Sequence, residues 1–440
     1  MAATSEVWPD LTARPFHGSD SGAAHDASAD DLLDGSGPSV CLFNHKELDT
    51  IDGGVIRIRQ MLSAMRRMNA HVSVFTYSQS LKSYRSGDGL FFGLPSHPWP
   101  ILRRTGSALY RGEEGASAVD IVLASKPSLA AHARNYVKAC DVVQCEHIWS
   151  SFWPLVQANA LGKPSVLDDH NVETLFARRL CDSVGRGMLP SAWLAYVKLL
   201  EGVACRLASK IIVTSEFDRR VLSRLLDVPP KKVEVVSNGT DTSRYSPSPE
   251  RARKARLKLG IPDSTPLLVF VGRLDFPPNL IAASLIVREI APEVLRRNPE
   301  ARFLILGCHA PNTFVDSVED PRIILSSDSD DVGYLNAADV CLAPMTVGSG
   351  TRIKVLNYFA CGKAVVSTDI GTEGITVTGG KNVMISSLSD FPDRIQMLLS
   401  DNELREEIGS KGRALVEEKY DWNTTMQDLR GIYSRICESG

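Results

Sequence analysis

Short apolar runs alternate with segments of helical spacing along most of the chain. Residues 40–43 form the first run, and the pair Gly53-Gly54 follows it. Apolar side chains then recur at the helical period: Val55, Ile58, Met61, Leu62 and Met65. Because residues 71–75 form the next apolar run, the pattern predicts a strand, a glycine turn, a helix and a second strand, the first unit of a doubly wound parallel sheet. The glycine pair either lets a ligand approach the backbone or simply makes a tight turn.

Two later apolar runs of the first half end in polar residues. Residues 141–145 lead into Glu146-His147, and residues 165–168 lead into the cluster DHNVE at 169–173. In an open α/β sheet, the carboxyl ends of parallel strands border the ligand-binding crevice. These polar groups are therefore expected to meet at one edge of the first sheet.

The same pattern restarts in the second half of the chain. A segment of helical spacing, from about 280 to 297, follows the first apolar run. The apolar runs lie at residues 267–271, 302–307, 322–325, 340–344 and 364–368. The sequence therefore predicts an α/β protein with two Rossmann-like, doubly wound domains that face an interdomain cleft.

Length and turn chemistry indicate the domain boundaries. A chain of 440 residues exceeds the usual size of one hydrophobic core. Pro247 and Pro249 follow the turn-rich segment 237–241, which marks the linker. We predict a disordered tail over 1–37, a first domain over 38–246, a second domain over 247–420, and a C-terminal helix over 421–440 that packs back on the first domain.

Composition is that of a soluble globular protein, with 43% hydrophobic residues, 23% charged residues and a net charge of −3. This balance gives no reason to expect a nucleic-acid partner. Nine cysteines are scattered without metal-ligand spacing, which indicates a reducing compartment and no metal site. Neither a signal peptide nor a membrane-spanning stretch is visible, so we expect a cytoplasmic protein.

Two segments are compatible with a peripheral membrane contact. The basic run 251–258 is interpreted as a solvated helix face, with an acidic lipid surface or acidic acceptor as the alternative. The apolar-rich helix expected over 186–207 is interpreted as packing in a core or between domains, with membrane docking as the alternative.

The stretch 348–362 carries the most specific chemistry. It lies between two apolar runs and begins with the turn GSGT, where backbone N–H groups can converge on an anion. The helix expected behind the turn adds partial positive charge, and Arg352 and Lys354 add full charges. Arg273, just beyond an apolar run, suits the same ligand, because a guanidinium binds diphosphate oxygens in pairs. The pattern is that of a phosphate-binding unit.

Together these segments resemble the family 4 retaining glycosyltransferases, which have the GT-B fold of two Rossmann-like domains. The resemblance covers the chain from about residue 38 to its end. It is carried, in the expected order, by Asp52-Gly53-Gly54, DHNVE at 169–173, VSNGTD at 236–241, VGRLD at 271–275, GSGTRIKVL at 348–356 and ACGKAVVST at 360–368.

The resemblance implies transfer of a sugar from a UDP- or GDP-sugar with retained anomeric configuration, in polysaccharide or glycoconjugate biosynthesis. In that family the leaving phosphate is thought to assist attack from the same face, and usually neither a metal nor another cofactor is needed. His170 and Arg273 would hold the catalytic positions. The donor would be bound by Gly53, Gly54, Arg273, Gly348, Ser349, Gly350, Thr351, Arg352, Lys354 and Asn357. The acceptor side would include Asp169, Asn171 and Glu173. The acceptor would be a small molecule, a glycan or a lipid-linked compound.

Three positions depart from the family pattern. Ser349 and Asn357 stand where the family commonly has two glutamates, and Asn279 stands near the position of a common lysine. Asn357 can still hydrogen-bond a ribose, and Arg352 or Lys354 can replace the missing charge. These departures keep an alternative function open, a catalytically weak nucleotide-sugar-binding or scaffold protein. A dehydrogenase is disfavoured, because no Gly-x-Gly-x-x-Gly motif follows the first apolar run.

Each candidate residue also has an ordinary structural interpretation. The alternatives are an ion pair with Asp275 for Arg273, a bond to Asp168 or Asp169 for His170, the first turn of a helix for Glu173, a local backbone partner for Asn357 and solvent for Lys354.

Overall fold

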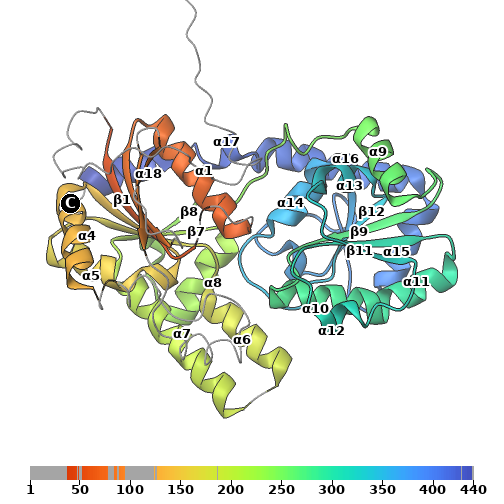
Figure 1. Cartoon of the computed structure of the whole chain (residues 1–440), viewed down its shortest axis with the longest axis horizontal. Coiled ribbons are helices and arrows are strands. Elements are labelled where there is room, and N and C mark those ends of the chain that lie inside the picture. The colour runs from red at the N-terminus through yellow and green to blue at the C-terminus, as the bar shows by residue number, and fades with distance from the viewer. Residues whose placement is uncertain are drawn as a thin grey trace, which may run out of the picture.

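The computed structural model describes residues 37–46, 48, 52–77, 84–86, 89–94, 123, 126–185, 187–427 and 429–438. Two sheets lie in separate lobes, one on the left and one on the right of Figure 1. The tail predicted over 1–37 lies outside the described residues, except for residue 37. The two-lobed α/β architecture confirms the predicted fold class.

The first sheet has eight strands in the order β3-β4-β2-β1-β5-β6-β7-β8, and all neighbours are parallel except β3 and β4. The strands are β1 (Ser39–Asn44), β2 (His71–Tyr77), β3 (Tyr84–Ser86), β4 (Gly89–Leu94), β5 (Val142–Glu146), β6 (Ser165–Asp169), β7 (Lys210–Val213) and β8 (Val233–Val235). The described helices of this lobe are α1 (Gly53–Arg67), α4 (Pro127–Ala139), α5 (Phe152–Ala160), α6 (Glu173–Val184), α7 (Met188–Leu207) and α8 (Glu216–Leu226), with short 3-10 turns η2 (Ile148–Ser150) and η3 (Pro230–Lys232).

Both faces of this sheet are covered, as the continuous apolar runs predicted. Successive side chains of a strand point to opposite faces. Cys41 and Phe43 join the core under α4, α5 and α7, whereas Val40 and Leu42 join the core under α1. This is why β1 reads as an unbroken apolar run rather than an alternating one.

The second sheet has six strands in the order β11-β10-β9-β12-β13-β14, all parallel. The strands are β9 (Leu267–Val271), β10 (Arg302–Leu306), β11 (Ile323–Ser326), β12 (Val340–Ala343), β13 (Ala364–Ser367) and β14 (Met384–Ile385). The helices are α9 (Pro249–Leu259), α10 (Pro277–Leu285), α11 (Ala291–Arg297), α12 (Asn312–Val315), α13 (Asp331–Ala337), α14 (Ile353–Ala360), α15 (Phe391–Ser400) and α16 (Asn402–Lys419), with a 3-10 turn η5 (Ile370–Thr372).

The helix predicted from about 280 to 297 is interrupted. A π-helical segment, η4 (Ile286–Ile290), separates α10 from α11. Pro292 follows this segment, and a proline ring clashes with the carbonyl group four residues earlier. The wider π turn accommodates the proline without ending the helical path.

Two chain crossings connect the lobes, and they pair with each other. Thr240 donates its N–H to the carbonyl oxygen of Tyr420 at 2.7 Å, and the Trp422 N–H donates to the carbonyl oxygen of Thr240 at 3.1 Å. A side chain at Gly239 would lie 2.9 Å from the Trp422 ring, so only glycine fits there. After this crossing come α17 (Trp422–Thr425) and α18 (Leu429–Glu438). Figure 1 shows α18 beside the first lobe, where Ile432 and Ile436 join its core.

Candidate functional site

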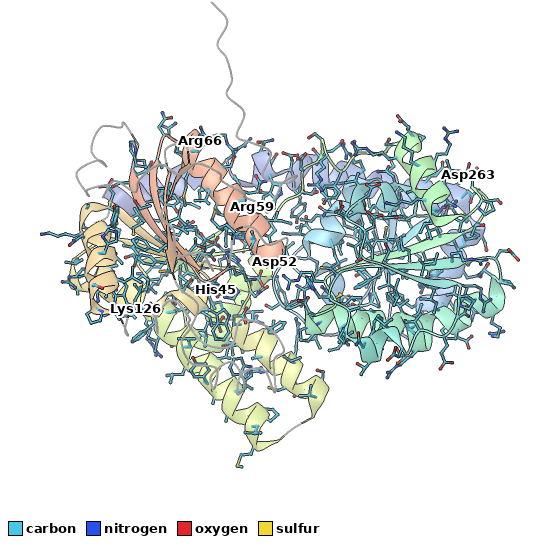
Figure 2. All side chains as sticks on the ribbon, in the orientation of Figure 1. His45, Asp52, Arg59, Arg66, Lys126 and Asp263 are labelled. Atoms are coloured by element: carbon cyan, nitrogen blue, oxygen red, sulfur yellow. The ribbon has the colours of Figure 1, made fainter. Side chains whose placement is uncertain are left out.

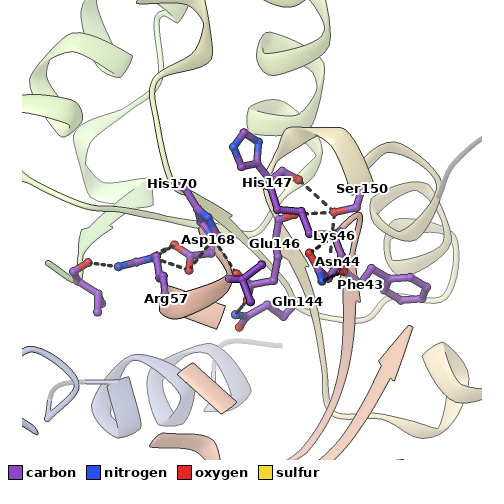
Figure 3. Close-up of polar contacts among 12 residues, drawn as sticks. Phe43, Asn44, Lys46, Arg57, Gln144, Glu146, His147, Ser150, Asp168 and His170 are labelled. Carbon is purple, nitrogen blue, oxygen red and sulfur yellow. Dashed lines mark hydrogen bonds and ion pairs between the residues drawn. The ribbon is translucent and has the colours of Figure 1, made fainter. Parts of the chain in front are cut away.

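A buried ion pair organises the carboxyl edge of the first sheet. Arg57 of α1 lies with its Nε 2.9 Å from Oδ2 and its Nη2 2.8 Å from Oδ1 of Asp168, in β6. Arg57 also donates from Nη1 to the carbonyl oxygen of Val236, at 2.9 Å, and to Oδ1 of Asn238, at 3.1 Å. Both charged residues are at most 1% exposed. One guanidinium therefore joins α1, β6 and the first crossing between the lobes (Figure 3).

His170 lies directly beyond this pair. Its Nε2 is 2.8 Å from Oε2 of Glu146, at the end of β5, and 3.6 Å from Oδ2 of Asp168 (Figure 3). Burial by itself would lower the pKa of His170, but hydrogen bonds and charge from the two carboxylates outweigh it and raise this pKa. The cationic form of His170 is thus favoured. Its Nδ1 is buried and has no hydrogen-bond partner among the described residues.

The two carboxylates beside His170 differ in their electrostatics. Burial and the neighbouring Asp168 raise the pKa of Glu146. Burial would also raise the pKa of Asp168, but Arg57 and His170 outweigh it and lower this pKa to about 2. Glu146, Asp168 and His170 place possible ligand atoms within 4.8 Å of one another. We interpret the group as an ion-pair network, because Arg57 and His170 already supply positive charge to both carboxylates.

His147 holds an unusual backbone conformation at the end of β5. Its φ of 74° and ψ of 155° lie in a region that is essentially restricted to glycine. The side chain is buried, with Nε2 3.3 Å from Oε1 of Glu173 and Nδ1 without a partner among the described residues. The imidazole ring packs edge-on to His170, with centroids 5.3 Å apart. Burial and the neighbouring His45 lower the pKa of His147, so Nδ1 is available as an acceptor.

The glycine turn before α1 brings the second lobe to this edge. Asp52 caps α1 by accepting a hydrogen bond from the Val55 N–H at 3.0 Å, and its other carboxylate oxygen lies 3.7 Å from Nη1 of Arg273. Figure 2 shows Asp52 at the end of α1 that faces the second lobe. A side chain at Gly54 would lie 3.4 Å from Nδ1 of His170. Gly54, His170 and Arg273, predicted separately, therefore lie around one point.

Arg273 also forms the ion pair with Asp275 that was the structural alternative to a phosphate contact. Its Nη2 lies 2.6 Å from Oδ2 of Asp275, and the side chain is 33% exposed. The guanidinium is thus held between two carboxylates, Asp275 from its own lobe and Asp52 from the other. A diphosphate would compete with both for the same donors.

The turn predicted to cradle phosphate packs against the first lobe. Ser349 Oγ accepts from the Val172 N–H at 3.1 Å, and the Thr351 N–H donates to Oγ1 of Thr214 at 3.2 Å. Gly350 has a φ of 71°, and a side chain there would lie 2.5 Å from the carbonyl oxygen of His170. In this structure Ser349 and Thr351 therefore hold the lobes together, which is a different role from the donor contact predicted for them.

An ion pair strengthens the same junction. Arg179 of α6 lies 2.8 Å from Glu373 in the second lobe and donates to the carbonyl oxygen of Gly348 at 2.6 Å. Gly348 and Gly350, both predicted as donor contacts, thus face first-lobe groups.

Lys354 is half-buried beside Arg273, and its ammonium group is directed to Asn279 rather than to solvent. Its Nζ donates to Oδ1 of Asn279 at 2.6 Å and lies 4.4 Å from the centre of the Phe270 ring. Asn279 in turn donates to the carbonyl oxygen of Arg273 at 2.9 Å. Burial, with a smaller contribution from Arg352, lowers the pKa of Lys354 to about 7. Its charge therefore depends on whether an anion is present.

Two other predicted donor contacts point elsewhere. Arg352 donates from Nη1 to the carbonyl oxygens of Ser349 and Gly350, and its Nη2 is buried without a partner among the described residues. Asn357 accepts at Oδ1 from the Thr240 hydroxyl at 2.7 Å, so its carbonyl group binds the crossing between the lobes. Arg352 thus stabilises the turn, and Asn357 binds a side chain of the interlobe crossing rather than the local backbone.

The predicted acceptor-side residues divide between two faces. Asn171 Nδ2 donates to Glu173 at 3.1 Å, and Glu173 contacts His147, so these two remain with the histidines. Asp169 is different: burial together with Glu201 and Glu173 raises its pKa well above the usual range, so its neutral acid is favoured. Neighbouring residues of a strand point to opposite faces, and Asp169 lies toward α7, away from Asp168 and His170.

Comparison with known proteins identifies the family. Residues 51–244 match the description "Glycosyltransferase Family 4", and residues 265–401 match "Glycosyl transferases group 1". The chain belongs to glycosyltransferase family 4. The family predicted from the motifs is thus confirmed.

Relatives of this family 4 glycosyltransferase are distant. It is 26% identical over 252 residues to a D-inositol 3-phosphate glycosyltransferase of Corynebacterium jeikeium (strain K411), a match that covers 53% of this chain and 59% of that relative. A sucrose-phosphate synthase from Thermosynechococcus elongatus has a TM-score of 0.71 at 16% identity, covering 92% of this chain and 100% of that one. HepE of Anabaena, in complex with UDP and glucose, has a TM-score of 0.65 at 15% identity, covering 90% of this chain and 99% of that one. These structures show the shared GT-B fold.

Across the described residues of this family 4 glycosyltransferase, no helix combines the length and the apolar character needed to cross a bilayer.

Arg57, Glu146 and His147 belong to the site but were not among the predicted site residues. Arg57 carried a signal, because it lies one helical turn before Met61 on the buried side of α1. Glu146-His147 was recognised only as the polar end of a strand. The backbone conformation of His147 leaves no sequence signal.

The strain at His147 predicts an inverted order of stability between two substitutions. His147→Ala removes the side chain and keeps the strained backbone, whereas His147→Gly removes both. The glycine variant should be more stable than the alanine variant by about 1–3 kcal/mol. Thermal melting of both proteins measures the difference. At a position with ordinary backbone angles glycine is the less stable of the two, so that order here would contradict the strain.

Proposed function

We propose that this family 4 glycosyltransferase moves a sugar from a UDP- or GDP-sugar to an acceptor held by the first lobe, with retained anomeric configuration. The observation that carries the proposal is the approach of Arg273 to Asp52, whose carboxylate lies beside Gly54, the glycine that also faces His170. A cation of the second lobe thus lies near the histidine–carboxylate network of the first, and a diphosphate bound by this cation would face that network. The HepE structure, described as a complex with UDP and glucose, supports a nucleotide-sugar donor.

The charges at the junction favour stabilisation of a leaving diphosphate. Arg273 and Lys354 come from the second lobe, and each would gain a phosphate partner when the donor binds. Positive groups placed where negative charge develops lower the barrier without forming a bond to the protein. Arg273 and Lys354 would therefore act on the departing group.

Retention results either from two successive displacements through a protein nucleophile or from attack by the acceptor on the side that the diphosphate leaves. The carboxylates nearest His170 are Asp168 and Glu146, and both are held in ion pairs or hydrogen bonds within the first lobe. Neither is free to act as a nucleophile. Same-face attack, with the leaving phosphate accepting the acceptor proton, needs no protein nucleophile. His147 Nδ1, as a buried acceptor, would orient the acceptor hydroxyl.

The state of the cysteines fits a reducing compartment such as the cytoplasm. The eight cysteines that the structure describes are free thiols. Nucleotide sugars are the donors we infer, and we propose that the protein works in the cytoplasm without a metal or another cofactor.

A second candidate function is a catalytically weak nucleotide-sugar-binding or scaffold protein. It is favoured by Ser349 and Asn357, whose side chains bind protein groups instead of facing Arg273. Calorimetric titration with UDP and GDP, followed by assays of donor hydrolysis and of the anomer formed, separates the two. Saturable binding with neither hydrolysis nor transfer would favour the scaffold.

Replacing Arg273 by alanine should weaken nucleotide binding. Loss of one charge-assisted contact costs about 1.5–3 kcal/mol, so the Kd for UDP or GDP should rise about 10- to 150-fold. Calorimetry measures it. Arg322→Ala is the matched control, because Arg322 makes a similar ion pair, 2.7 Å to Asp320, with 35% of its side chain exposed. Equal effects of the two substitutions would contradict the phosphate contact.

Nucleotide affinity should fall as pH rises through about 7, the pKa of Lys354. Below this pH the ammonium is present and attracts the diphosphate; above it the proton is lost, and binding must first restore it. Lys354→Met should weaken binding at pH 6 and flatten the profile, with pH 6 taken as about one unit below that pKa. Titrations across the range, with Lys254→Met on the surface of α9 as control, test this. A profile unchanged in Lys354→Met would rule the lysine out.

His170→Ala should keep nucleotide binding and lose sugar transfer, because its ring faces Gly54 and the first-lobe carboxylates rather than Arg273. The Kd for UDP should stay within about twofold, whereas kcat should drop by about 100-fold or more. Calorimetry and a transfer assay give the two values, with thermal melting as the check on folding. Retained turnover would remove His170 from the catalytic residues.

A further inference from the structure

The α6–α7 hairpin ends in an exposed apolar tip. The two helices lie side by side and extend away from both sheets at the bottom of Figure 1. Three residues form what we call the hairpin tip: Val184, Met188 and Leu189, which are 59%, 87% and 68% exposed. Large apolar side chains exposed together mark an interaction site more often than a free surface.

Exposed apolar side chains continue along one face of α7. Met188, Ala192, Ala195 and Leu199 recur at helical spacing, and all four are exposed, Leu199 by 64%. The buried residues of α7 begin at Val197. The interpretation of residues 186–207 as a packing helix therefore holds for one face of α7, where Trp193 and Leu194 pack against the first-lobe core, and the opposite face is exposed.

We propose that the hairpin tip inserts into the headgroup region of an anionic lipid surface. The exposed charged residues that the structure describes on the outer hairpin are Arg178, Asp182 and Lys198, which leaves an excess of positive charge. Apolar side chains on a projecting element, flanked by cations, suit a lipid interface. A stable protein partner would need about 20–30 residues on each side, far more than the tip offers.

The basic helix α9 is the weaker candidate for the same surface. Lys254 is paired with Glu250 at 2.6 Å, and Lys258 is paired with Asp328, so much of its charge is neutralised within the protein. Figure 1 shows α9 and the hairpin at opposite edges of the molecule, so the two would not contact one flat surface together.

The hairpin is fixed to the proposed site at its inner end. Glu201 of α7 accepts hydrogen bonds from the N–H groups of Glu173 and Thr174, at 2.7 and 2.8 Å, and thereby caps α6. Glu173 contacts His147 at one end of α6, and Val184 belongs to the tip at the other end. The 12 residues of α6 span about 18 Å.

This geometry indicates a class of acceptor. The inference rests on the proposed transferase function. A lipid surface at the hairpin tip would lie about the length of α6, about 18 Å, beyond the residue that contacts His147. The acceptor would then be lipid-anchored, with a polar headgroup long enough to cross that distance while its chains remain in the membrane.

Vesicle flotation of the full chain tests the proposal. Vesicles of phosphatidylcholine with phosphatidylglycerol should carry the protein upward, and phosphatidylcholine alone should carry less. Met188→Ser with Leu189→Ser should reduce the bound fraction on anionic vesicles by about tenfold or more. Leu257→Ser is the matched control, because Leu257 is 70% exposed on α9 and should leave binding unchanged.

The outcomes separate this inference from the transferase function. UDP titration without vesicles reports on the donor site alone, and it should be the same for the tip variant and the unaltered chain, which also shows that the variant folds. Failure to float with saturable UDP binding overturns only the lipid contact. An equal loss of vesicle binding in Leu257→Ser would also overturn the lipid contact. So would a dimer, detected by light scattering, that the tip substitutions dissociate, because a second copy of the chain would then be the partner.

Discussion

The arrangement of the first lobe depends on the buried pair between Arg57 and Asp168. A guanidinium without water must satisfy its donors within the protein, and this one does so on a carboxylate of β6, a carbonyl oxygen and an amide of the interlobe crossing. Removing one partner of such a pair costs about 3–5 kcal/mol, because the other charge is left buried and uncompensated. The pair therefore fixes α1, with its glycine turn, relative to the strand that carries His170.

Opposite charges face each other across the junction that this pair orients. The first lobe contributes the carboxylates of Asp52, Glu146 and Asp168, and the second lobe contributes Arg273 and Lys354. Without a donor, Arg273 is balanced by carboxylates, whereas Lys354 is hydrogen-bonded to the neutral amide of Asn279. Burial, with a smaller contribution from Arg352, lowers the pKa of Lys354 to about 7. A bound diphosphate would provide the anion that Lys354 lacks and would compete with the carboxylates for Arg273. The contacts of Ser349 and Thr351 with the first lobe would bring the lobes to the position where this exchange occurs.

Much of the fold was predictable because its signals are local. Parallel strands buried on both faces appear as continuous apolar runs, and glycine turns followed by helical spacing mark each strand-to-helix unit. The interruption at Pro292 and the exposed apolar face of α7 were not predicted, since one depends on how a helix accommodates a proline and the other on what packs against α7. Within the site, Gly54, His170 and Arg273 converge as the motifs suggested. Ser349, Asn357 and Asp169 do not join them, because the direction of a side chain depends on the packing around its backbone.

The sequence by itself determined the family, the two α/β lobes and the strand ends at which polar chemistry gathers. These follow from residue spacing, and spacing is preserved in the linear chain. Only the tertiary structure decided that Arg57 pairs with Asp168, that Lys354 meets Asn279 from another helix, and that His147 is held in a backbone conformation usual only for glycine. Each of these facts is a contact between segments far apart in the chain, or strain imposed by such contacts, and no local pattern of residues encodes it.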